Sequence, residues 1–200
     1  ARERIIYAVT SYMDACGYIP CGRESAERTV AFARINGGWA IFDDCADRLD
    51  IRSMNGLARS LTSGLNTRAI GVVGFRQGFM LRLYCNGLLR DIFSTSIKSN
   101  ISSPFGLGSG HAIRWRSVLK ESTSVRELSN AFLNARKNPD EGFEELRRLL
   151  FLDKSACYGF ASIEDSGLEC IVTMYFNASN HIRQRWFDRF LRIPARCSRT

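Results

Sequence analysis

The sequence predicts an α+β fold: a mainly antiparallel sheet of about seven strands, built from hairpins and a meander, covered by about five to six helices. Short apolar runs separated by tight turns predict antiparallel neighbours, because a tight turn joins strands that run in opposite directions. The helical patterns come in a block rather than after each strand, which is typical of α+β folds. Residues 70–73 and 168–175 are apolar on both faces, so we expect helices on both sides of the sheet.

The first third of the chain predicts two helices around a hairpin. Apolar residues three and four apart over residues 3–16 predict a helix that ends at Gly17, a favourable residue just beyond a helix. Asn36-Gly37-Gly38 lies between two short apolar runs and predicts a turn. The expected strands of this hairpin are 29–35 and 39–43, and the expected second helix covers 51–65 and stops near Asn66.

Residues 69–93 predict a three-stranded meander and carry the clearest local signal in the chain. Asn86-Gly87 lies between apolar runs, and this pair favours a two-residue type I′ turn because both residues tolerate a positive φ. Gln77-Gly78 is expected to supply the earlier turn.

A stretch rich in serine and glycine, residues 94–110, predicts a long surface loop. We expect it to lie within a single α+β domain over residues 1–200, because the residues after it supply few strands of their own. Asn138 and Pro139 form a strong helix start, with the acidic Asp140 and Glu141 in the first turn. The later elements expected are helices 113–120, 125–136 and 139–152, a hairpin of strands 157–163 and 168–176, and a basic helix over 181–192.

Composition favours a reduced, cytoplasmic protein. The seven cysteines are an odd number and contain no C-x-x-C pair, although Cys16 and Cys21 are close enough in sequence to bridge if oxidised. The first residues carry charge of both signs without a small-residue cleavage site, which is not typical of a secretory signal. No window approaches the roughly 18 apolar residues of a transmembrane helix, so no transmembrane segment is expected.

The last twenty residues hold the clearest charge asymmetry. They contain six arginines against one aspartate, so +5 of the net charge of +8 lies there. On the expected helix, Trp186 belongs to an apolar stripe, whereas Arg183, Arg185, Arg189 and Arg192 are available to a phosphate backbone, another polyanion or an acidic protein. The simpler interpretation is a terminal helix that docks its aromatic stripe on the sheet and leaves its arginines in water.

Three further residues are weaker candidates. Asp43 and Asp44 follow a strand, and carboxylates converging there could hold a divalent cation. The simpler account is that Asp47 or Asp50 caps the helix that follows. His111 comes after a glycine-rich loop and could serve as a base, but that loop matches neither a phosphate-binding nor a nucleophile-elbow motif.

The sequence therefore predicts no catalytic residue, no metal and no cofactor, and it leaves three functions open. The favoured one is a non-enzymatic protein that binds another protein, for example an inhibitor or neutralising partner. The second is a nucleic-acid-binding module that uses the arginine-rich C-terminal helix. The third is an enzyme with a site near residues 94–111, in which His111 acts with a thiol or with Asp43 and Asp44.

Overall fold

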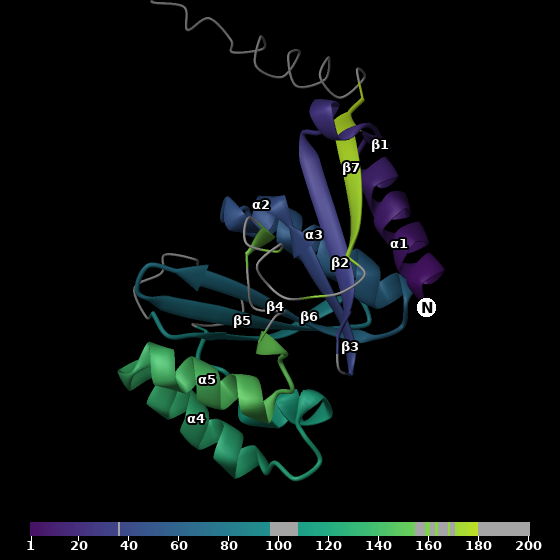
Figure 1. The fold of residues 1–200 in the computed structure, drawn as a ribbon. Coiled ribbons are helices and arrows are strands. Elements are labelled where there is room, and N and C mark those ends of the chain that lie inside the picture. Colours follow the sequence, from purple (N-terminus) through teal and green to yellow (C-terminus); the bar gives the residue numbers. More distant parts are fainter. Residues whose placement is uncertain are drawn as a thin grey trace, which may run out of the picture.

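The computed structural model describes residues 1–35, 37–96, 108–154, 159–160, 163, 168 and 171–179, and over these residues the fold is α+β (Figure 1). The strands expected in one sheet form two separate antiparallel sheets, with the orders β1-β7-β2-β3 and β4-β5-β6. The strands are β1 (Tyr18–Pro20), β2 (Arg28–Ile35), β3 (Gly38–Asp43), β4 (Arg68–Phe75), β5 (Gly78–Cys85), β6 (Leu88–Ser94) and β7 (Val172–Ala178).

The four longer α-helices of the described residues lie where the sequence pattern predicts them, with ends that differ by a few residues. The short helices over Arg23–Ser25 and Asp44–Asp47 were not predicted. Asp50 caps α3, and Ser124 forms a reciprocal capping box with Glu127 at the start of α4. The helices are α1 (Arg2–Ala15), α2 (Asp44–Asp47), α3 (Ile51–Gly64), α4 (Val125–Lys137) and α5 (Pro139–Leu149), with 3₁₀ helices η1 (Arg23–Ser25) and η2 (Ala112–Val118).

Two expected helices differ in kind or length. The α-helix expected over residues 113–120 is the 3₁₀ helix η2, a short connector anchored in the core by Trp115, and such connectors commonly take this tighter form. The helix expected to end at residue 152 ends at Leu149, because Phe151 takes a left-handed conformation with a φ of 54°.

The meander has the predicted strands and the predicted second turn. Asn86 and Gly87 have φ values of 49° and 79°, as a type I′ turn requires. The first turn lies one residue earlier than expected: Phe75 pairs with Gly78, so Arg76 and Gln77 occupy the turn.

The first sheet joins distant parts of the chain. β2 and β3 form the predicted hairpin, and β7 lies between β1 and β2, antiparallel to both. The short strand β1 was not predicted. Of the hairpin expected between 157–163 and 168–176, the second strand is present as β7, which begins at Val172. In the first, the described residues Gly159, Phe160 and Ile163 belong to no strand, and its other residues lie outside the described ones.

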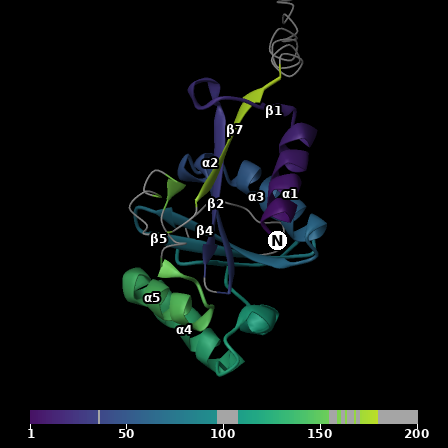
Figure 2. The same ribbon diagram turned by 45° about the vertical axis from the view of Figure 1, so that its right-hand side comes forward.

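The second sheet is covered on both faces, as its apolar pattern predicts (Figure 2). Alternate residues of β5, Phe79, Leu81 and Leu83, pack against η2, α4 and α5, while Met80 packs on the other face against Met54 of α3. Leu57 and Leu61 of α3 join a further core with α1 and the first sheet. Among the described helices, none combines the length and the apolar character needed to cross a membrane.

Candidate functional site

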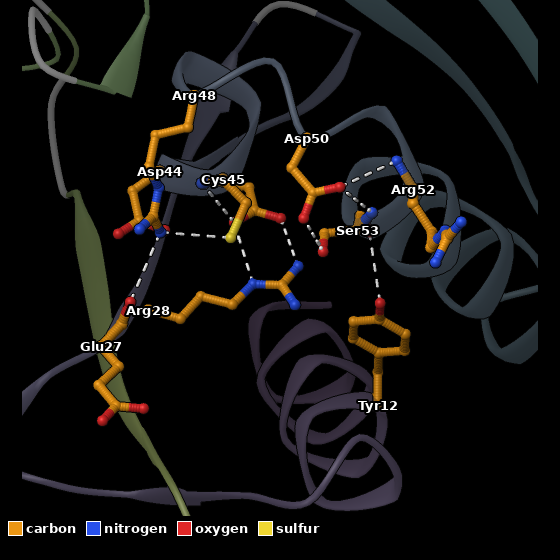
Figure 3. Close-up of polar contacts among 10 residues, drawn as sticks. Tyr12, Glu27, Arg28, Asp44, Cys45, Arg48, Asp50, Arg52 and Ser53 are labelled. Carbon is orange, nitrogen blue, oxygen red and sulfur yellow. Dashed lines mark hydrogen bonds and ion pairs between the residues drawn. The ribbon is translucent and has the colours of Figure 1, made fainter. Parts of the chain in front are cut away.

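Polar side chains gather where α1, the first sheet and α2 meet (Figure 3). At the centre Arg28 is only 2% exposed, and its Nε and Nη2 atoms donate to Asp43 Oδ1 and Oδ2 at 3.1 and 2.5 Å. Asp43 is also buried. Arg28 begins β2 and Asp43 ends β3, so the hairpin register brings them together. We call these two residues the buried ion pair.

Two aromatic rings flank the guanidinium of Arg28. Its central carbon lies 5.5 Å from the ring centre of Tyr12 and 5.9 Å from that of Tyr18. Burial lowers the pKa of Arg28, but the hydrogen bond and charge of Asp43 outweigh this effect and raise the pKa above its ordinary value. The guanidinium therefore stays charged.

The carboxylates that follow β3 mainly cap helices. Asp43 Oδ1 accepts from the Cys45 backbone N–H at 3.2 Å and so caps α2, a short helix that the sequence did not predict. Asp50 caps α3, as expected, by accepting from the backbone N–H groups of Arg52 and Ser53 at 3.1 Å. Hydrogen bonding by Ser53 lowers the pKa of Asp50, because it favours the charged form.

Arg48 lies at the solvent-exposed edge of the cluster. Its Nη2 atom lies 3.2 Å from Asp44 Oδ1 and 3.4 Å from Cys45 Sγ, and it also donates to the Glu27 carbonyl oxygen at 3.5 Å. The Arg48 side chain is 59% exposed, so this outer ion pair is screened by water.

Asp43, Asp44 and Cys45 have the spacing of a cation site, since their ligand atoms lie within 4.8 Å of one another. Both Asp43 oxygens, however, accept from Arg28. Burial raises the pKa of the Cys45 thiol to about 11, so the thiolate that a metal requires is disfavoured. The charges of this cluster are satisfied by arginines, which favours a structural role.

The structure does not bring His111 to the acidic residues. His111 is exposed and precedes η2, which packs with α4 and α5 on one face of the second sheet. Asp43 and Asp44 lie at the start of α2, and α2 lies on the opposite side of the second sheet from α4 and α5 (Figure 1). The His111 backbone N–H donates to Asp91 Oδ2 at 2.6 Å, and Trp115 Nε1 donates to the same atom at 2.7 Å. This carboxylate anchors the chain that leads into η2.

The remaining predicted site residues lie outside the described residues. They are Arg183, Arg185, Trp186, Arg189 and Arg192, together with most of the loop expected over 94–110.

An open groove between α1 and α3 was not predicted. Its volume is about 340 Å³, and Tyr7 on its rim is 75% exposed. Beside the groove α1 and α3 approach closely: a Cβ atom on Gly56 would lie 2.3 Å from Tyr12 Oη. The sequence signal was Tyr7, which lies on the polar face of a helix whose other face carries Ile5 and Val9. The lining residues are Glu3, Arg4, Tyr7, Ala8, Ser11, Ser60, Gly64 and Leu65.

Comparison with known proteins does not assign this chain to a family, because no family model, no curated protein and no solved structure matches it.

Proposed function

We propose that this chain is a non-enzymatic binding protein that recognises another protein at the groove between α1 and α3. The observation that carries the proposal is the exposure of Tyr7 beside this largely apolar groove. Tyrosine and arginine contribute much of the binding energy at protein interfaces, and Tyr7 and Arg4 both line the groove. An apolar side chain of the partner would fill the space beside Ala8 and Leu65.

The positions of the ionisable groups support binding over catalysis. Asp43 is held by Arg28 and Asp44 by Arg48, while His111 lies toward the other face of the second sheet. General acid–base chemistry needs such groups within hydrogen-bond reach of one substrate. We propose a cytoplasmic inhibitor or neutralising partner of a larger protein as the concrete form of this function.

Affinity capture from nuclease-treated native lysate, with Tyr7→Ala and Leu133→Ala as matched variants, tests the proposal. Leu133 is 54% exposed on α4, away from the groove, so it controls for the loss of an exposed apolar side chain. The wild type and Leu133→Ala should retain one stoichiometric protein, and Tyr7→Ala should lose it. Equal capture by all three, or no stoichiometric protein, contradicts the proposal.

A nucleic-acid-binding module is the alternative, and the +5 charge of the last twenty residues is the observation that favours it. Under this alternative, nuclease would abolish the captured material, and affinity for nucleic acid would fall steeply with salt. Changing Arg185 and Arg189 together to glutamate would then remove binding, whereas Tyr7→Ala would leave it intact.

A further inference from the structure

The described part of the chain has four buried charged side chains, and one of them has no partner of opposite charge. Arg28 pairs with Asp43, and Asp91 lies 3.5 Å from Arg114. Arg82, in the middle of β5, is 4% exposed and has no carboxylate among the described residues within ion-pair distance. An unpaired buried charge is costly, so the environment of Arg82 calls for compensation.

The neighbours of Arg82 leave hydrogen-bond donors in excess. Arg82 Nε donates to Tyr84 Oη at 3.0 Å, and Nη1 lies 3.8 Å from Met80 Sδ, a weak acceptor. The Tyr84 hydroxyl donates in turn to Asn55 Oδ1 on α3. Within the described residues these are the hydrogen bonds of the cluster, and they leave the second terminal nitrogen of Arg82 and the Asn55 amide group as donors.

Asp91 cannot neutralise Arg82, because the two lie on opposite faces of the second sheet. Arg82 pairs with Ile92 of β6, so its side chain shares a face with that of Ile92. Asp91 is the preceding residue, and it contacts Trp115 on the face covered by η2 and α4. The sheet itself separates the two charges.

Helix α3 connects the surroundings of Arg82 with the surface of the protein. Asn55 is half-buried, and Arg59, one turn further along the helix, is exposed. Burial raises the pKa of Tyr84, and the charges of Arg82 and Arg59 oppose this effect, so both guanidinium groups act on the same phenol. The cluster thus runs from the buried Arg82 to the exposed Arg59.

We propose that Arg82, Asn55 and Tyr84 form a binding site for a small oxyanion that carries a phosphate or carboxylate group. Such a group has acceptors only, which suits a cluster with surplus donors: the second terminal nitrogen of Arg82 and the Asn55 amide group can both donate to it, and a hydrogen bond from a charged arginine is a strong one. Arg59 guides the anion in from the surface. This site is independent of the protein-binding function proposed for the α1–α3 groove.

Thermal unfolding of the full chain in phosphate, in acetate and in chloride at matched ionic strength tests the proposal. Phosphate or acetate should raise the Tm of the wild type above its value in chloride, because a ligand that binds only the folded state stabilises it. Phosphate also stabilises folded proteins in general because it is excluded from their surface, so a response to phosphate identifies a phosphate site only where the Arg82 variants below lose it. A response to acetate that the same variants lose identifies a carboxylate site. No difference among the three salts overturns the proposal.

Two variants test whether the rise in Tm depends on Arg82. Arg82→Met should weaken the affinity by about tenfold or more, since it removes charge-assisted hydrogen bonds. Arg90→Met, at an exposed position on β6, makes the same charge change and should behave as the wild type. If Arg82→Met does not fold, Arg82→Lys keeps the charge but loses the planar fork, and its response should be weaker than that of the wild type. An unchanged response in whichever Arg82 variant folds overturns the proposal.

Discussion

The Asp43 carboxylate accepts two hydrogen bonds, of 3.1 and 2.5 Å, from the Arg28 guanidinium, and both residues are buried. This contact ties the start of β2 to the end of β3, and the same carboxylate caps α2. This buried polar cluster therefore stabilises the fold where the first sheet meets α1 and α2.

Asp43→Asn should destabilise the protein strongly. It removes the negative charge and leaves Arg28 charged and buried, which costs about 3–5 kcal/mol when one partner of a buried pair is lost. Urea unfolding at pH 7 measures the loss. Asp44→Asn is the matched control: its partner Arg48 is 59% exposed, and an exposed pair contributes about 1 kcal/mol or less. Equal losses for the two variants would show that the Arg28–Asp43 contact is not the stronger one.

Stability should fall as the pH rises from about 9 to 12. Burial raises the pKa of Cys45 from 9.0 to about 11 and that of Tyr12 from 10.0 to about 12, so the folded state keeps protons that the unfolded state loses. Both contributions are complete below the unfolded pKa values and disappear as the pH passes the folded ones. The urea midpoint is measured as a function of pH. In Cys45→Ala, the decrease of this midpoint that the thiol causes between about pH 9 and 11 should be absent. An unchanged profile in this variant would rule out the thiol as its source.

Asp91→Ala should loosen the connection into η2. It leaves the buried Nε1 of Trp115 without its acceptor, at a cost of about 1–3 kcal/mol for an unsatisfied buried donor. We expect a lower free energy of unfolding and a shift of tryptophan emission to longer wavelength. Arg114→Met removes the half-exposed ion pair with Asp91 and a hydrogen bond to the Arg90 carbonyl oxygen, but it keeps the acceptor of Trp115 and should leave the emission unchanged. A shift of the same size in Arg114→Met would argue against this role for the Trp115 hydrogen bond.

Gly142→Ala should separate α4 from α5. A Cβ atom at this position would lie 2.1 Å from Ala135 Cα on the neighbouring helix, so the backbone must move, and overpacking costs about 1–3 kcal/mol. Gly64 ends α3 with no atom near its missing Cβ, so Gly64→Ala should be neutral or slightly stabilising in thermal unfolding. A neutral Gly142→Ala would contradict the close packing of the two helices.

Local signals predicted the elements that depend on adjacent residues. The Asn86-Gly87 turn is favoured by the two residues themselves, because both adopt a positive φ, and Asp50 caps α3 through Arg52 and Ser53, two and three residues further along the chain. The division into two sheets could not be predicted in this way. It depends on β7 reaching β1 and β2 across most of the chain, and a strand as short as Tyr18–Pro20 has no periodicity of its own.

The candidate site was harder to predict than the fold because its parts are distant in sequence. Arg28 and Asp43 meet through the hairpin register, so the acidic run alone favoured helix capping, left a cation as the weaker alternative and gave no sign of the arginine that the structure has there. The groove is lined by residues of both α1 and α3, and no local pattern encodes how two helices pack together. The exposed Tyr7 was visible in the sequence only as an aromatic residue on a polar helix face.

Hydrogen–deuterium exchange of the chain, free and bound to the captured partner, tests the central claim most directly. Binding at the groove predicts slower exchange in residues 2–11 of α1 and 60–65 at the end of α3, with η2, α4 and α5 unchanged. Protection confined to η2, α4 and α5, or none in α1 and α3, would contradict binding at the α1–α3 groove.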